Sequence, residues 1–116
     1  TAAELNGQAF YFTGGASLRD DSAAALQDYA GRVATLASAV TASDGQASIS
    51  ILGYTDGTGG ADINARLAER RAAAVRSALV AAGVSAQSIT TGAEVPASGE
   101  LDLDARRAVV GVSVSR

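Results

Sequence analysis

The most constraining feature of this sequence is a strand pattern, a glycine-rich loop and a long helical pattern in direct succession. Residues 48–54 (SISILGY) alternate polar and apolar side chains, which is typical of a half-buried strand. The loop 56–60 (DGTGG) leads into a helical pattern over about 61–82, with Gly83 as its predicted C-cap. A strand that continues into a helix requires a crossover connection, so this unit predicts a layered α/β fold.

Comparable patterns precede and follow this unit. Residues 9–12 form a short strand pattern, and apolar side chains at spacings of three and four predict a helix over about 22–42. Residues 87–91 and 108–114 are two further strand patterns, and the loop 94–103 between them has no helical periodicity. The predicted order is β-α-β-α-β-β. We therefore expect an α/β (α+β) sandwich, in which two helices pack on one face of a mixed four-stranded sheet and the last strand is antiparallel.

Composition narrows the classes of function. A chain of 116 residues can bury a core, and we expect one domain over residues 1–116 with its core at about 9–115. The net charge of −3 argues against nucleic-acid binding, which requires a basic patch. The chain has no Cys and no His, so thiol and imidazole nucleophiles and the metal sites they build are excluded. The acidic pairs 20–21 and 102/104 match no calcium loop, and we expect neither a metal nor a cofactor.

The chain contains no apolar run that approaches the roughly 18–20 residues of a membrane span. It begins at Thr1 without a signal-peptide pattern. We therefore expect an excised domain or a processed form, attached to any membrane only through flanking segments.

Two polar side chains, Asn64 and Arg71, interrupt the apolar face of the helix predicted over 61–82. At about 100° per residue they share a sector with Ile63, Leu67, Ala74, Val75, Ala78 and Leu79. Unpaired burial of polar groups is costly, and Asp56 at the end of the preceding strand is the obvious partner. The Asp56–Arg71 couple is either a structural ion pair or a split site that binds an ammonium at Asp56 and a carboxylate at Arg71. The flanking glycines favour the second interpretation, because they let backbone N–H groups approach a ligand.

Other chemistries fit less well. The loop 56–60 lacks the Gly-Lys-Ser/Thr end of a phosphate loop. Hydrolysis by paired carboxylates would need a second acid near Asp56, and Glu94 is the only candidate, so we do not expect an enzyme. Arg106 and Arg107 precede the last strand, where neighbouring side chains point to opposite faces. One of the two is therefore expected to reach the site and the other to face water.

Together these residues resemble the OmpA-like C-terminal domain family. Its pattern, roughly G-[HY]-T-D followed by spaced N, L, R-A and V, is similar to GYTDGTGGADINARLAERRAAAV at residues 53–75, with no insertion between Asp56, Asn64 and Arg71. FTGGASL at 12–18 and TGAEVP at 91–96 are similar to two further family segments, and Arg106-Arg107 to its N-R-R-V. The resemblance covers about residues 9–115.

The resemblance implies non-covalent binding of peptidoglycan through the diaminopimelate of its stem peptide. Such a domain, without catalysis, would anchor a host protein or the outer membrane to the cell wall from the periplasm. The resemblance implies that Asp56 of this chain holds the ammonium of diaminopimelate and that Arg71 holds its carboxylate. The remaining residues implied to line the pocket are Thr58, Asn64, Leu67 and one of Arg106 and Arg107.

The sequence departs from the family pattern at a few positions. Ala68, Ala93 and Ala105 replace a Ser, a Gly and an Asn, and the loop 97–105 is shorter. We expect these changes to affect the rim of the pocket more than its Asp–Arg centre. The alternative function is a protein-interaction or oligomerisation scaffold in which Asp56–Arg71 is only a structural ion pair. The sequence is compatible with either a monomer or a homodimer.

Overall fold

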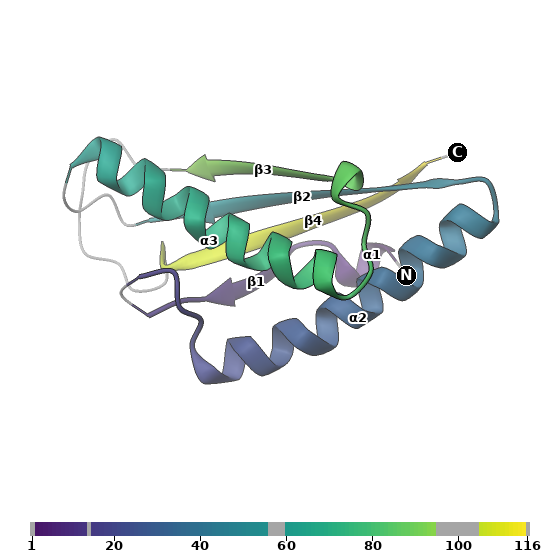
Figure 1. The fold of residues 1–116 in the computed structure, drawn as a ribbon, viewed down its shortest axis with the longest axis horizontal. Coiled ribbons are helices and arrows are strands. Elements are labelled where there is room, and N and C mark those ends of the chain that lie inside the picture. The colour runs from purple at the N-terminus through teal and green to yellow at the C-terminus, as the bar shows by residue number, and fades with distance from the viewer. Residues whose placement is uncertain (1, 14, 56–59, 95–104, 116) are drawn as a thin grey trace.

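The computed structural model describes residues 2–13, 15–55, 60–94 and 105–115 of the chain (Figure 1). In chain order the elements are α1 (Ala2–Leu5), β1 (Gln8–Tyr11), α2 (Asp20–Ala42), β2 (Gln46–Tyr54), α3 (Ala61–Ala81), the short 3₁₀ helix η1 (Ala86–Ser88), β3 (Ile89–Glu94) and β4 (Arg107–Ser115). The predicted order of strands and long helices is confirmed. None of the helices in the described ranges is long and apolar enough to cross a membrane.

The described strands form one mixed sheet in the order β1-β4-β2-β3. Strands β2 and β3 are parallel, and α3 makes the crossover between them. The last strand, β4, is antiparallel to both of its neighbours, β1 and β2. The predicted mixed sheet with an antiparallel last strand is therefore confirmed, and β4 lies inside the sheet rather than at its edge.

Helices α2 and α3 lie across one face of the sheet (Figure 1). Side chains alternate along β2, so that Ala47, Ile49 and Ile51 are buried under the helices while the residues between them point the other way. We call the opposite face, to which Ser48 and Leu52 point, the open face. The largest apolar side chains buried between sheet and helices are Phe10, Phe12, Val33, Ile49, Ile51, Val75, Leu79 and Val110.

Helix α2 begins two residues earlier than predicted. The Ser22 Oγ accepts a hydrogen bond from the Tyr11 main-chain N–H at 3.0 Å, which ties the start of α2 to β1. The first turn carries Asp20 and Asp21, whose carboxylates suit a helix N-terminus. At the end of α3 the C-cap is Ala82, one residue before the predicted Gly83, and Gly83 with a φ of +112° takes the left-handed position directly after the cap.

The third strand begins later than the predicted 87–91. The Ser88 N–H donates to the Ser85 carbonyl at 3.0 Å and closes a 3₁₀ turn, so the parallel ladder starts at Ile89 opposite Ile49. Helix α1 was not predicted, because four residues are too few to show helical periodicity.

The predicted inner face of α3 is rotated relative to the observed one. Ile63 is 69% exposed, whereas Ala68 and Ala72 are fully buried. The inner positions in the described part of the helix are Asn64, Ala68, Arg71, Ala72, Val75 and Leu79. Their mean direction lies roughly 120° from Ile63 at 100° per residue. Hydrophobicity alone misplaced the stripe, because the close approach of helix and sheet selects small side chains for the inner positions.

Candidate ligand-binding site

Arg71 lies on the inner side of α3, over the end of β2. Its side chain is only 2% exposed and is among the largest fully buried side chains in the described ranges. The sequence prediction of an inward-facing arginine is therefore confirmed. A long cationic side chain is rarely buried to this degree, so its surroundings determine what the region can do.

Two segments that are distant in sequence from α3 hold the Arg71 guanidinium: residues 12–15 and the end of β2. Its Nε donates to the Gly15 carbonyl at 3.1 Å, and Nη1 donates to the Tyr54 carbonyl at 2.8 Å. Its central carbon lies 5.8 Å from the centroid of the buried Phe12 ring. These contacts set the plane and direction of the guanidinium before any ligand arrives. A guanidinium held in this way presents a planar donor fork, and a carboxylate is the group whose geometry matches such a fork.

A close approach of α3 to β2 places Arg71 at this end of the sheet. A Cβ added to Gly53 would lie 1.7 Å from the Ala68 carbonyl oxygen, so only glycine fits beneath the helix there. Ala68 itself is fully buried in this contact. We expected Ala68 to alter the rim of a pocket, and this was wrong, because the residue lies in the interface between helix and sheet. Ala105 is also nearly buried, at 9% exposure, while Ala93 is exposed.

Two other predicted site residues lie on the same helix as Arg71. Asn64 is 5% exposed, and its main-chain N–H donates to the Gly60 carbonyl at 3.0 Å in the first turn of α3. Leu67 is half-buried. Asp56 and Thr58 lie outside the described residues, so their places in the site stay predictions.

The paired arginines before and at the start of β4 are placed differently. The Arg107 guanidinium lies over the Tyr54 ring, 4.3 Å from its centroid. By strand alternation both Arg107 and Tyr54 belong to the open face, away from Arg71. Arg106 precedes the strand, and its carbonyl accepts the Phe12 N–H at 2.7 Å. Alternation assigns its side chain to the helix-covered side.

Sequence reasoning missed the residues that orient Arg71. Tyr54 contributes twice: its carbonyl accepts from Arg71, and its ring stacks under Arg107 on the other face. Gly15 contributes only a carbonyl. Main-chain acceptors leave no side-chain signal, and the single clue was that both residues belong to the quoted GYTD and FTGG segments.

The described part of the site offers hydrogen-bond donors and a buried cation, and no metal-binding cluster. No group of three or more His, Cys, Asp or Glu side chains lies close enough to hold a metal ion in the described ranges. Such an arrangement can bind and orient an anionic group.

A sequence model of the OmpA family matches residues 10–108. This chain belongs to the OmpA family. The matched range runs from β1 to the start of β4, and therefore contains Arg71 and both of its main-chain acceptors, Gly15 and Tyr54.

Two relatives illustrate how this OmpA-family chain compares with known proteins. It is 38% identical over 79 residues to the probable lipoprotein YiaD of Escherichia coli (strain K12), a match that covers 68% of the chain and 36% of YiaD. The chain thus spans about a third of that relative. The crystal structure of the peptidoglycan-associated lipoprotein from Burkholderia pseudomallei superposes with a TM-score of 0.69 at 26% identity, covering 91% of this chain and 90% of that one.

A more distant structure has the same fold. The periplasmic domain of Helicobacter pylori MotB (residues 78–256) gives a TM-score of 0.62 at 16% identity, over 93% of this chain and 76% of that domain. At this identity the likeness extends to the fold alone.

Proposed function

We propose that this OmpA-family chain is a non-catalytic peptidoglycan-binding domain that recognises the diaminopimelate of a stem peptide. In this role it anchors a host protein or the outer membrane to the cell wall from the periplasm. The observation that carries the proposal is the buried Arg71 guanidinium, oriented by the Gly15 and Tyr54 carbonyls at the end of β2.

A pre-oriented, buried guanidinium suits a ligand carboxylate. The planar donor fork of Arg71 can bind a carboxylate through two parallel hydrogen bonds, and burial strengthens each of them. Asp56 comes two residues after Tyr54, the last residue of β2, and would accept the ammonium of the same ligand centre. Diaminopimelate carries this ammonium and carboxylate together at the end of its side chain.

The remaining contacts are assigned from position. Asn64 and Leu67 lie on α3, two turns and one turn before Arg71 respectively, and Thr58 belongs to the loop that leads into this helix. We assign the further cationic contact to Arg106, because Arg107 stacks on Tyr54 on the open face. One domain over residues 1–116 would contain all of these groups.

The relatives support the cellular setting. One is named a lipoprotein and one a peptidoglycan-associated lipoprotein. Peptidoglycan is the polymer named in the second of these. A wall-binding role in the periplasm, with attachment to the outer membrane through flanking segments, agrees with both names.

Titration calorimetry with a diaminopimelate-containing stem peptide tests the proposal. The control ligand is the same peptide with Lys, which lacks the side-chain carboxylate. We expect saturable binding of the first and at least tenfold weaker binding of the second, since a charge-assisted hydrogen bond contributes about 1.5–3 kcal/mol. No binding of either peptide to the folded domain would refute the proposal.

Variants at Asp56 separate the ligand site from a structural ion pair. Asp56→Asn should leave the unfolding transition in place and weaken binding of the diaminopimelate peptide, whereas the matched variant Asp62→Asn, on the exposed first turn of α3, should bind as the parent does. A large loss of stability in Asp56→Asn, with no effect on binding by the folded fraction, would favour the scaffold interpretation instead.

A further inference from the structure

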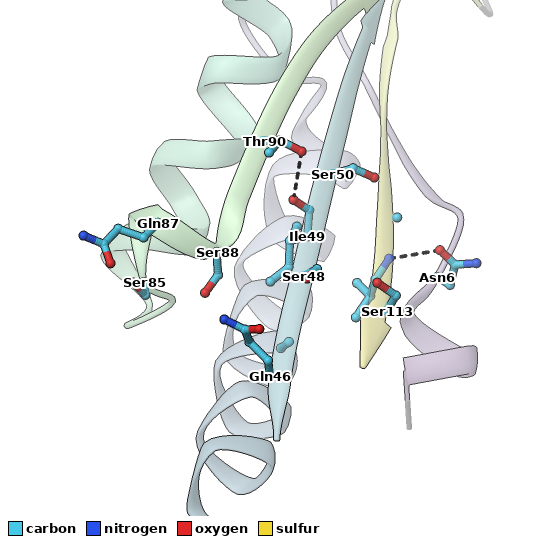
Figure 2. Close-up of a pocket in the computed structure, with 13 residues that line it drawn as sticks. Asn6, Gln46, Ser48, Ile49, Ser50, Ser85, Gln87, Ser88, Thr90 and Ser113 are labelled. Atoms are coloured by element: carbon cyan, nitrogen blue, oxygen red, sulfur yellow. Dashed lines mark hydrogen bonds between the residues drawn. The ribbon is translucent and has the colours of Figure 1, made fainter. Parts of the chain in front are cut away.

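The open face of the sheet carries a groove near the start of β2, at the end of the sheet that is farther from Arg71. The groove has a volume of about 480 Å³ and is lined by residues of β2, β3, β4 and η1 and by Asn6 (Figure 2). Ser48 lies six residues before Tyr54 on β2, which places the groove roughly 20 Å along the strand from the end that holds Arg71. The groove is therefore separate from the site described above.

Hydroxyl groups form a regular array on the floor of the groove. Ser48 of β2 is the direct cross-strand partner of Ser113 of β4, and Ser50 is the partner of Gly111. Figure 2 shows Ser48, Ser50 and Ser113 on neighbouring strands, with Gln46 at one end. Neighbouring strands are about 4.8 Å apart, so hydroxyls on adjacent strands are separated by about the width of one sugar ring. Gly111 has no side chain, so the groove stays open beside the Ser50 hydroxyl, where a Cβ would contact the Ser50 Oγ.

These hydroxyls are available to a ligand. Ser48, Ser50 and Ser113 are exposed, and no hydrogen bond within the described part of the chain engages their side chains. Two other lining side chains are partly engaged. Thr90 Oγ1 donates to the Ile49 carbonyl at 3.5 Å, and the Asn6 side-chain oxygen accepts the Val112 N–H at 2.9 Å.

The lining residues carry no charge. All of them are Ser, Thr, Asn, Gln, Gly or aliphatic, although 18% of the whole chain is charged. Among the described residues of this groove a phosphate or carboxylate would find no cation, and an ammonium would find no carboxylate. A purely apolar ligand would desolvate the hydroxyls without replacing their bonds to water. The chemistry that remains is a neutral ligand with many hydrogen-bonding groups.

We propose that this groove binds an uncharged stretch of glycan that carries hydroxyl and acetamido groups. The inference rests on the proposed function, because the glycan strand of peptidoglycan presents these groups next to the stem peptide. None of the described residues that line the groove is aromatic, so affinity comes from hydrogen bonds and should be near the millimolar range for an isolated oligosaccharide. In the wall, simultaneous contact at the groove and at Arg71 would strengthen attachment through effective concentration.

The test is an NMR titration of the ¹⁵N-labelled chain with the tetrasaccharide of N-acetylglucosamine, which carries no peptide. We expect saturable shifts at the amides of Ser48, Ser50, Gly111 and Ser113, and no shifts around Arg71. The double variant Ser48→Val/Ser113→Val should reduce the affinity at least fivefold. Valine is favoured in strands, so the variant should keep its fold. The matched control is Thr91→Val, an exposed position of β3 in register with Ile51, whose side chain belongs to the other face.

The outcomes separate this inference from the proposed function. Absence of saturable shifts up to roughly 20 mM ligand, well above a millimolar Kd, would overturn it. Shifts confined to other residues, or equal binding by the double variant, would do the same. The stem peptide, titrated in parallel, reports only on Arg71, and the double variant should bind it unchanged. If the tetrasaccharide binds in the groove and the stem peptide does not bind, the groove proposal stands and the Arg71 proposal fails.

Discussion

At the scale of single residues, one buried cation and one glycine determine the geometry of the candidate site. Arg71 is held by carbonyls that lie 56 and 17 residues away in sequence, so its direction depends on the packing of three segments. Gly53 sets how closely α3 approaches β2. A substitution at either residue therefore tests one feature of the site: the direction of the guanidinium at Arg71, or the distance between helix and strand at Gly53.

Arg71→Lys should weaken binding of the diaminopimelate peptide at least tenfold and lower the free energy of unfolding by about 1–3 kcal/mol. Lysine keeps the positive charge but cannot supply the two fork donors that reach the Gly15 and Tyr54 carbonyls. Calorimetry and urea denaturation measure the two effects. The neighbouring Arg70 is exposed, and Arg70→Lys should change stability by less than about 0.5 kcal/mol. Binding by Arg71→Lys equal to that of the parent would contradict the assigned role.

Gly53→Ala should lower the free energy of unfolding by more than about 2 kcal/mol, because the added methyl would collide with the rigid main chain of α3 at Ala68. The matched control is Gly31→Ala. Gly31 is an exposed residue of α2, and a Cβ there would meet nothing within 4 Å. Since alanine is the better helix former, we expect this control to stabilise the chain by about 0.5–1 kcal/mol. Equal free energies of unfolding for the two variants would show that α3 can move away from β2 to admit the methyl group without loss of stability.

At the scale of elements, Tyr29 joins α1 to α2. Its hydroxyl donates to the Leu5 carbonyl at 2.7 Å, and its ring contacts Phe10 edge-on with centroids 5.1 Å apart. Burial raises the pKa of Tyr29 from 10.0 to about 12, because the phenolate is poorly solvated there. A helix of four residues has little stability of its own, so this contact should hold α1 in place.

The raised pKa predicts a loss of stability at alkaline pH. Between pH 10 and about 12 the unfolded chain releases the Tyr29 proton while the folded chain keeps it. The contribution of Tyr29 is therefore fully present below pH 10 and decreases as the pH rises through this window. Tyr29→Phe should lower the free energy of unfolding by about 1 kcal/mol near neutral pH through the lost hydrogen bond. Urea denaturation of both proteins should show this difference shrinking between pH 9 and pH 11, and a constant difference would contradict the assignment.

At the scale of the whole molecule, the charge of the chain affects how it meets its ligand. The net charge is −3 and the isoelectric point is about 4.7, so long-range attraction to an anionic wall polymer is not expected. Under the proposed function, recognition therefore comes from local contacts at the buried Arg71 guanidinium, which salt screens weakly.

We therefore expect the Kd for the stem peptide to change by less than about tenfold between roughly 0.1 M and 1 M salt, where the Debye length falls from about 10 Å to about 3 Å. Calorimetry at several salt concentrations measures this. A steep loss of affinity with salt would mean that exposed charges, rather than Arg71, carry the binding.

Much of the fold followed from local pattern. The alternation in residues 48–54 and the spacing in 22–42 and 61–82 depend only on which side chains face a core, and the structure confirms all three elements with shifts of one or two residues. The candidate site was harder to predict from the sequence than the fold. The inward direction of Arg71 was predictable, but its acceptors were not, because carbonyls of distant segments leave no trace in residue identity.

The sequence by itself determined the order of strands and long helices, the termination of α3 just before Gly83 and the burial of Arg71, since each follows from periodicity or from the conformational range of one residue type. Only the tertiary structure decided that β4 lies between β1 and β2, that Ile63 faces solvent, and that hydroxyls from separate strands meet in one groove. These features depend on strand pairing and on the distance between helix and sheet. Both are set by contacts between segments far apart in the chain.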